Sequence, residues 1–274
     1  MKEFFTEVWG HRIRYIRSED GENTYAVLFI HGLGSAADRW MDLPEALSFY
    51  FTAYAIDLVG FGKSDKPTSL SYDIPEFVEF LREFIRKEMT KYNKIILVGH
   101  SLGGYIACEF VIKYPTLARK LVLVDSSGTL DKPTPLLAEY LDVAMNPSYD
   151  KAISVFRKMV ANPLFVSPLV TEIFINNISN EAAKNAFTLT LENSATTQIR
   201  PERLRKIKVP TFIIWGVEDR VIPMEHAEIF SGNIVGSKLA KIEHAGHAPF
   251  VEKPSVVFDL IRRFLVDNSL ISPP

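Results

Sequence analysis

The chain has 274 residues, of which 47% are hydrophobic and 23% charged. A chain of this length and composition can bury enough apolar surface for a stable core, which excludes intrinsic disorder for most of it. The 31 Lys and Arg residues nearly balance the 33 Asp and Glu residues. Such a balance lacks the basic surface that nucleic-acid phosphates require, so we expect no nucleic-acid partner.

Short apolar runs alternate with longer helical patterns along the chain. The runs are rich in Val, Ile and Leu, as in parallel strands buried on both faces, and lie at residues 27–30, 94–98, 120–124 and 211–215, with a further strand-like stretch at 237–242. Helical patterns cover residues 75–91 and 102–113 and follow Pro254 near the end of the chain. This alternation predicts an α/β fold, with a mostly parallel, twisted sheet and helices on both faces.

The alternation breaks between residues 131 and 205. This stretch lacks strand-like runs, is interrupted by prolines, and contains helical patterns at 136–145 and 182–191. We therefore predict a core formed by residues 1–130 and 206–274, with a mostly helical insertion over 131–205. The apolar content of the insertion exceeds what exposed loops need, so its side chains either form a small core or line a substrate cleft.

The segment Gly99-His100-Ser101-Leu102-Gly103 lies between a predicted buried strand and a predicted helix. A sharp turn at this point would expose the Ser101 hydroxyl, and the small residues on either side would relieve the crowding. The start of the helix would add positive potential beside the hydroxyl. The segment indicates a nucleophilic serine, and the alternative is a glycine-rich turn with an incidental serine.

A serine hydroxyl needs a base, and the base needs an orienting group. Two of the six histidines, His244 and His247, lie at the end of a predicted strand and on the loop beyond it. We favour His247 as the base and place His244 beside it, as a supporting or cleft-lining residue. We expect His11 and His100 to be structural, with the His100 side chain leaving the turn in another direction, and His226 to lie on the surface.

Three carboxylates are candidates for the orienting acid. Glu218 and Asp219 lie in a turn-rich segment after the predicted strand 211–215, and Asp125 follows the strand 120–124. Each of them could instead cap a helix or pair with an arginine, which is the commoner role of a loop acid.

These segments together resemble the α/β-hydrolase superfamily over nearly the whole chain. His31-Gly32-Leu33-Gly34 is similar to the oxyanion-loop motif of that family, and residues 57–64 resemble its glycine-rich turn. Residues 99–103 resemble its nucleophile elbow, and Gly246-His247 with the acidic and proline residues behind it resembles the segment of the catalytic histidine. The order serine, acid, histidine is also that of the family.

The resemblance implies a role for individual residues. It makes Ser101 the nucleophile, His247 the base and Asp219 the acid, with the backbone N–H groups of Leu33 and Leu102 as oxyanion-hole donors. It also makes the insertion 131–205 a helical cap. Some members place the acid after the earlier strand, so Asp125 stays open, and Val59 stands where many relatives have arginine.

A serine at the elbow favours acyl transfer, because relatives that attack alkyl carbon carry aspartate there. We therefore expect a serine hydrolase that cleaves carboxylic esters of small to medium, largely uncharged substrates through an acyl-enzyme, without a metal or an organic cofactor. One alternative is a carbon–carbon bond hydrolase of ring-cleavage diketones that uses the same triad. Many such relatives carry a Gly-Pro-rich oxyanion segment, whereas residues 32–35 lack proline. Another alternative is a non-catalytic binding or receptor protein of the same fold.

The environment of the protein follows from cysteine use and hydropathy. The single cysteine, Cys108, offers neither an internal disulfide nor a metal-ligand spacing, which is typical of a reducing compartment. The apolar runs are far shorter than the about 20 residues of a membrane span. We expect a cytoplasmic protein without a signal peptide or an integral membrane segment.

Overall fold

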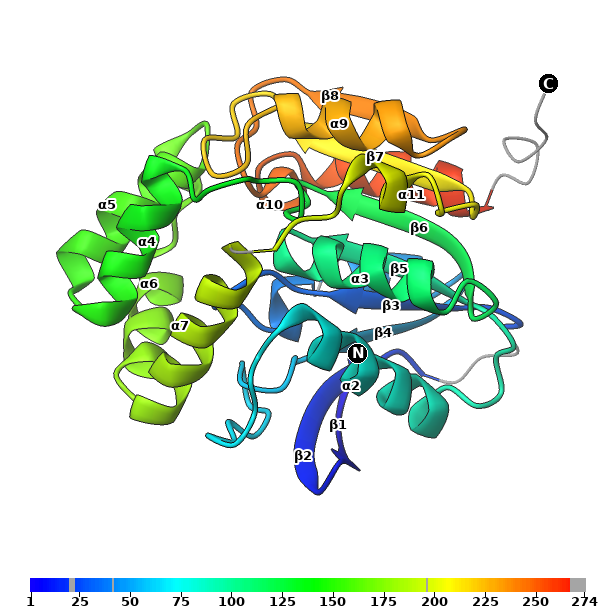
Figure 1. Ribbon diagram of the computed structural model, residues 1–274, viewed down its shortest axis with the longest axis horizontal. Helices are drawn as coiled ribbons and strands as arrows, with labels where there is room; N and C mark the ends of the chain where they lie inside the picture. The colour runs from blue at the N-terminus through cyan, green and yellow to red at the C-terminus, as the bar shows by residue number, and fades with distance from the viewer. Residues whose placement is uncertain (20–22, 41, 196, 267–274) are drawn as a thin grey trace.

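The computed structural model describes residues 1–19, 23–40, 42–195 and 197–266. Within these ranges one eight-stranded sheet forms, in the order β1-β2-β4-β3-β5-β6-β7-β8 (Figure 1). β1 pairs antiparallel with β2 and β2 antiparallel with β4, and the remaining neighbours are parallel. The strands are β1 Lys2–Val8, β2 His11–Arg17, β3 Ala26–Ile30, β4 Thr52–Ile56, β5 Ile95–His100, β6 Ala118–Val124, β7 Thr211–Gly216 and β8 Lys238–Ile242. The predicted mostly parallel sheet is confirmed.

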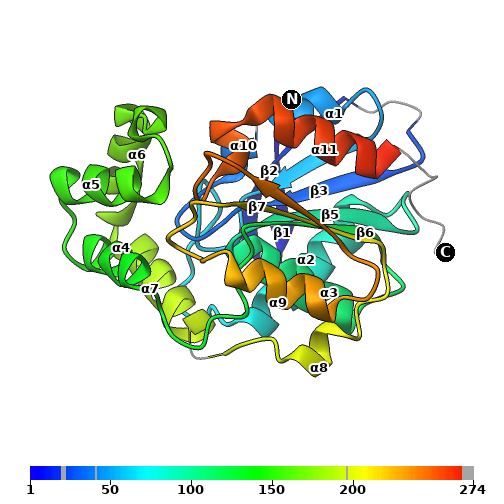
Figure 2. The same ribbon diagram turned by 90° about the horizontal axis from the view of Figure 1, so that it is seen from above.

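Helices cover both faces of the sheet, as predicted (Figure 2). α2 (Ile74–Glu88), α3 (Leu102–Lys113) and α9 (Glu225–Asn233) lie on one face, and α1 (Asp42–Leu47) and α11 (Pro254–Val266) lie on the other. Side chains alternate between the faces along a strand. In β3, Leu28 and Ile30 accordingly join the core under α2 and α3, while Val27 and Phe29 join the core under α11. Four short elements complete the core and its loops: η1 Ala37–Trp40, η2 Pro163–Phe165, α8 Pro201–Leu204 and α10 Pro249–Glu252.

Helix bounds differ little from those expected. α3 runs from Leu102 to Lys113, as predicted. α2 begins at Ile74 because the Asp73 side chain accepts a hydrogen bond from the N–H of Glu76, which caps the first turn. It ends at Glu88, before the predicted end at residue 91, because Met89 leaves the helical conformation.

In the described part of the chain between β6 and β7, the four longest helices lie together at one end of the sheet (Figure 1). They are α4 Pro135–Met145, α5 Tyr149–Met159, α6 Pro168–Ile178 and α7 Glu181–Ala195. Rings from all four pack against one another, with centroid separations of 5.0 Å for Tyr140 and Phe187 and 5.2 Å for Phe156 and Phe174. This aromatic cluster is continuous with the core under α2 and α3, so the helices are anchored to the sheet.

Two features concern the single cysteine and the length of the helices. Cys108 is buried in α3, and its burial raises the pKa of the thiol well above the ordinary value. A buried, protonated thiol of this kind is unreactive. Over the described ranges, no helix is both long enough and apolar enough to cross a bilayer.

Candidate active site

Ser101 lies at the sharp turn between the end of β5 and the start of α3. Its backbone has φ 52° and ψ −118°, a conformation that non-glycine residues rarely adopt. The turn is held by a hydrogen bond from the Ser101 N–H to the carbonyl of Val124, 3.1 Å long. Gly103 permits the turn, because a Cβ there would overlap the carbonyl group of Ile30. The strained turn places the Ser101 side chain beyond the end of the strand.

Asp219 and His247 form a buried hydrogen-bonded pair. The Asp219 Oδ2 and His247 Nδ1 atoms are 2.7 Å apart. The other oxygen, Oδ1, accepts hydrogen bonds from the N–H groups of Val221 at 2.7 Å and Ile222 at 3.0 Å. The backbone therefore fixes the carboxylate while its free oxygen faces the imidazole. With Asp219 ionised, His247 Nδ1 donates and Nε2 is left to accept a proton.

The backbone of His247 is held on both sides. Its N–H donates to the carbonyl of Met159 in the inserted helices, at 2.7 Å, and its carbonyl lies 2.6 Å from His100 Nε2. Burial lowers the pKa of His100 well below the ordinary value, so the neutral ring donates from Nε2. The prediction that the His100 side chain leaves the turn in another direction is wrong. Its ring packs against that of His247, with 4.8 Å between centroids.

Ser101 and His247, the predicted nucleophile and base, are connected through His100 and not by a direct hydrogen bond. In the part of the chain that the structure describes, no hydrogen bond joins the Ser101 hydroxyl to His247. His100, the residue before Ser101, is what contacts the His247 ring. Catalytic hydrogen bonds are often long without substrate and tighten in the complex.

The two predicted oxyanion donors are the backbone N–H groups of Leu33 and Leu102. Leu102 begins α3, and Leu33 lies in the loop after β3. Neither N–H is bonded to an acceptor among the described residues. The loop approaches the turn closely, since a Cβ on Gly32 would lie 3.1 Å from the Cβ of Ser101. Both N–H groups are therefore available to a substrate oxygen beside the Ser101 turn.

Two hydrogen bonds of His31 hold the loop that carries Gly32 and Leu33. His31 Nδ1 lies 2.7 Å from the carbonyl of Gly32, and the N–H of Leu58 donates to His31 Nε2 at 3.0 Å. This pattern makes His31 a neutral Nδ1–H tautomer, in agreement with the lowering of its pKa by burial. The Tyr140 hydroxyl of α4 donates to the carbonyl of Leu33 at 3.3 Å, so an inserted helix also contacts the loop.

Glu252 joins the inserted helices to the loop of His247, a link that the sequence pattern did not predict. Its carboxylate accepts hydrogen bonds from the N–H groups of Gly246 at 2.8 Å, Ala161 at 2.8 Å and Asn162 at 3.4 Å. Burial raises the pKa of Glu252, while the three hydrogen bonds act in the opposite direction. In the sequence, Glu252 was only the acidic residue behind Gly246-His247 in the family motif, and nothing there indicated a contact with the inserted helices.

The other candidates from the sequence lie elsewhere. The His244 side chain is 83% exposed and lies 3.5 Å from Glu218, so His244 does not line a buried cleft and Glu218 does not orient His247. His226 is not a simple surface residue as expected: it is half-buried, and its Nδ1 lies 2.9 Å from the Thr129 hydroxyl.

Asp125 lies next to the pair formed by Asp219 and His247. Its carboxyl and the facing atoms of Asp219 and His247 all lie within 4.8 Å of one another. A metal ion could use this spacing, but the Asp219 and His247 atoms already share a hydrogen bond. We therefore assign no metal ligand here and interpret the cluster as a site of acid–base chemistry.

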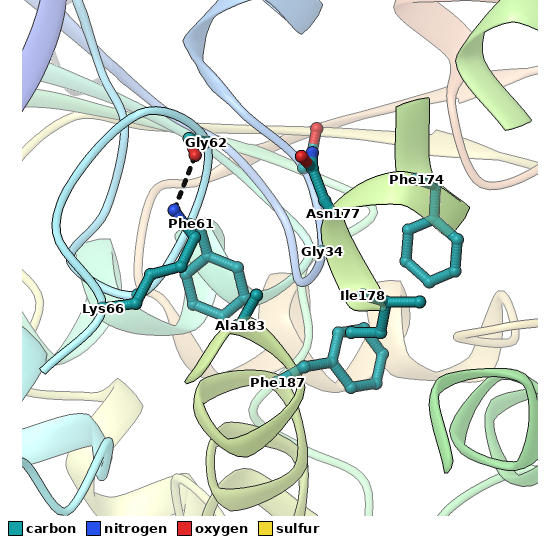
Figure 3. Close-up of a pocket in the computed structure, with 11 residues that line it drawn as sticks. Gly34, Phe61, Gly62, Lys66, Phe174, Asn177, Ile178, Ala183 and Phe187 are labelled. Atoms are coloured by element: carbon teal, nitrogen blue, oxygen red, sulfur yellow. Dashed lines mark hydrogen bonds between the residues drawn. The ribbon is translucent and has the colours of Figure 1, made fainter. Parts of the chain in front are cut away.

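A small pocket opens between the inserted helices α6 and α7 and the loops that follow β3 and β4 (Figure 3). Gly34, the neighbour of Leu33, forms part of its wall, and Phe174 and Phe187 contribute apolar surface from the insertion. Lys66 is the charged residue of the wall, and its Nζ donates to the carbonyl groups of Gly62 and Ser64, at 2.8 and 2.9 Å. The wall of the pocket is therefore largely apolar beside Gly34.

Comparison with known proteins decides the family. The profile of a family described as alpha/beta hydrolase fold matches residues 25–254. The chain belongs to the alpha/beta hydrolase fold family. The resemblance in the motifs is confirmed, and this hydrolase has both the sheet and the helical arrangement of the family.

Relatives of this alpha/beta hydrolase differ in activity. The chain is 28% identical to 2-hydroxy-6-oxo-6-(2'-aminophenyl)hexa-2,4-dienoic acid hydrolase from Metapseudomonas resinovorans, over 92% of this chain and 87% of the relative. It is 28% identical to Lipase 1 from Psychrobacter immobilis, over 87% and 76% of the two chains. The solved meta-cleavage product hydrolase from Pseudomonas fluorescens IP01 superposes with a TM-score of 0.87 at 21% identity, covering 96% of this chain and 97% of that one. This structural likeness shows the shared fold.

Proposed function

We propose that this alpha/beta hydrolase is a serine hydrolase that cleaves carboxylic esters of small to medium, largely uncharged substrates. Ser101 is the nucleophile, His247 the base and Asp219 the acid. The observation that carries the proposal is the buried 2.7 Å hydrogen bond between Asp219 and His247, on loops that lie beside the strained Ser101 turn. A serine with a base, and a base with an orienting acid, is the arrangement that nucleophilic catalysis requires.

The proposed reaction proceeds through two acyl transfers. The Ser101 Oγ atom attacks the ester carbonyl carbon as His247 Nε2 takes its proton, and Asp219 stabilises the imidazolium. The negative charge on the carbonyl oxygen is stabilised by the N–H groups of Leu33 and Leu102; one such donor is worth about 3 to 4 kcal/mol in related enzymes. His247 then protonates the leaving alcohol, and water repeats the sequence to release the acid. The steps use no metal and no organic cofactor.

Three observations support an ester as the substrate. The elbow carries serine, which forms acyl intermediates. The small pocket beside Gly34 is lined largely by apolar side chains, which is the surface that an acyl or alkyl chain would contact. A lipase is among the relatives that align over most of this chain.

A series of p-nitrophenyl esters of increasing acyl length tests the proposal. We expect turnover by the wild-type protein, with a preference that reports the depth of the pocket. Ser101→Ala should abolish turnover, whereas Ser231→Ala, a control on α9, should retain it. Equal turnover by wild type and Ser101→Ala would refute the proposal.

A carbon–carbon bond hydrolase acting on ring-cleavage diketones is the second candidate, and the relative that hydrolyses a hexa-2,4-dienoic acid favours it. The same serine, histidine and aspartate would serve that reaction. The absence of proline from residues 32–35 favours the ester instead. Parallel assays with esters and with 2-hydroxy-6-oxohexa-2,4-dienoates separate the two, since we expect the larger kcat/KM for the esters.

A further inference from the structure

Asp125 is a buried carboxyl group without an assigned role in the proposed triad. It follows β6 with φ 44° and has no exposed surface. Its Oδ1 accepts a hydrogen bond from the N–H of Gly216 at 2.9 Å, while Oδ2 is buried and no donor of the described residues reaches it. Asp219 lies within hydrogen-bonding reach of the Asp125 side chain. An ionised Asp125 would therefore leave a buried, unsatisfied oxygen next to a second carboxylate.

The hydrogen bonds around the two acids determine which one carries the charge. Asp219 receives three donors, from the N–H groups of Val221 and Ile222 and from His247, whereas Asp125 receives one. Two carboxyl groups in contact do not both ionise at neutral pH, and the better-solvated one keeps the negative charge. Burial, followed by the charge of Asp219, raises the pKa of Asp125 well above the ordinary value. These facts place the negative charge on Asp219 and the proton on Asp125.

We propose that Asp125 is a positioning residue that keeps its proton at neutral pH and donates its Oδ2–H to the Asp219 carboxylate. This hydrogen bond satisfies the buried Oδ2 of Asp125 and adds a further donor to the Asp219 carboxylate, which keeps Asp219 aligned with His247. The catalytic part of this inference rests on the proposed triad, and the protonation part does not. The other titratable groups that act on this pair are Glu252 of α10 and His226 of α9.

The protonation is tested by the stability of Asp125→Asn as a function of pH. Asparagine keeps an acceptor for the Gly216 N–H and a donor toward Asp219, but it does not titrate. A raised pKa means that the folded wild type retains a proton that the unfolded chain releases, so wild-type stability falls as pH rises above the ordinary Asp value. Asp125→Asn does not lose stability in this way, because asparagine does not titrate.

We expect the unfolding constant of the wild type, relative to that of Asp125→Asn, to increase about tenfold for each pH unit above pH ~4, until the folded-state pKa is reached. Urea unfolding of both proteins between pH 4 and 8 measures this ratio. Asp57→Asn is the matched control, because Asp57 is equally buried but accepts hydrogen bonds from the N–H groups of Ala37 and Lys63 and faces Arg14. Asp57→Asn should be destabilised at neutral pH. A ratio for Asp125→Asn that stays constant with pH would overturn the proposal.

The positioning role is tested by a comparison of Asp125→Asn with Asp125→Leu. Leucine has a similar size but removes both the donor and the acceptor. We expect kcat for esters to stay within about threefold of wild type in Asp125→Asn and to fall at least about tenfold in Asp125→Leu, with KM little changed in both. Equal kcat in the two variants would refute the positioning role.

The outcome of each test can be decided without the other. If Asp125→Leu does not fold, the pH dependence of Asp125→Asn still decides whether Asp125 carries the proton. If the wild type hydrolyses no ester, the proposed function is refuted, and the unfolding ratio still decides the protonation of Asp125.

Discussion

Replacement of Glu252 tests how the inserted helices and the loop of His247 are held together. In Glu252→Ala, the N–H groups of Gly246, Ala161 and Asn162 lose their common acceptor. Two of these hydrogen bonds are 2.8 Å long and involve a carboxylate. We expect both the stability of the fold and the placement of His247 to suffer.

The size of the effect follows from these contacts. A hydrogen bond to a charged group contributes about 1.5 to 3 kcal/mol, and the cost of burying the carboxylate offsets part of the sum. We therefore expect Glu252→Ala to lose about 3 kcal/mol of unfolding free energy, which corresponds to a decrease in Tm of about 6 to 12 °C for a domain of this size. Glu252→Gln should lie between wild type and Glu252→Ala, since its amide retains one acceptor oxygen but turns an N–H toward another N–H.

The contribution of Glu252 to stability depends on pH. Because burial raises the pKa of Glu252 above its ordinary 4.5, the folded state keeps a proton that the unfolded chain has lost, and wild-type stability falls as pH rises through that window. The advantage of wild type over Glu252→Gln is therefore largest near pH 4 and smaller at neutral pH. Thermal unfolding with ester kcat measured in parallel is the assay. If Tm decreases by less than about 2 °C in Glu252→Ala and kcat is unchanged, Glu252 does not couple the inserted helices to the loop of His247.

Three further substitutions test separate parts of the site. Asp219→Asn should lower kcat for p-nitrophenyl butyrate by about 10⁴, because the amide no longer holds His247 in the tautomer that accepts the proton. Its stability, measured by circular dichroism, should stay near that of the wild type. Full activity would exclude Asp219 as the acid. Gly103→Ala should lose about 1 to 3 kcal/mol in urea unfolding, since its Cβ meets the carbonyl of Ile30, and a neutral result would contradict the tight packing of the turn. Tyr140→Phe should lose about 1 kcal/mol from its hydrogen bond to Leu33, again measured by urea unfolding, and a larger loss would point to a further role of the hydroxyl.

β3, β5, β6, β7 and the edge strand β8 were predictable from the sequence, whereas the interior strand β4 and the edge strand β1 were not. β3, β5, β6 and β7 are buried on both faces, and their continuous apolar runs reveal them. β1 is an edge strand with a largely exposed pattern, and its charged residues hide it from that criterion. The helices α5 and α6 of the insertion were not predicted individually either, because their bounds depend on tertiary packing among aromatic rings.

The site was predictable in its residue types but not in its contacts. Motif spacing singled out Ser101 and the histidine on the loop after β8, whereas the choice among Glu218, Asp219 and Asp125 depends on how two loops meet. The structure places Asp219 against His247, Glu218 against exposed His244, and Asp125 next to the pair of Asp219 and His247. Contacts between segments far apart in the sequence leave no local signal.

The inserted helices contact two loops of the candidate site. The carbonyl of Met159 accepts the N–H of His247, and the Tyr140 hydroxyl reaches the carbonyl of Leu33. The insertion thus contacts the loop of the proposed base and the loop of a proposed oxyanion donor. A displacement of the inserted helices would alter both loops, so we expect substrate fit and catalytic geometry to change together.

Covalent labelling by a fluorophosphonate tests the central claim, the activation of Ser101, most directly. The reagent reacts with activated serines, so intact-protein mass spectrometry should show one adduct on the wild type, and peptide mapping should place it on Ser101. Ser101→Ala should remain unlabelled, and His247→Ala should label far more slowly. A wild-type protein that forms no adduct, or a Ser101→Ala variant that labels as fast as wild type, would contradict the account.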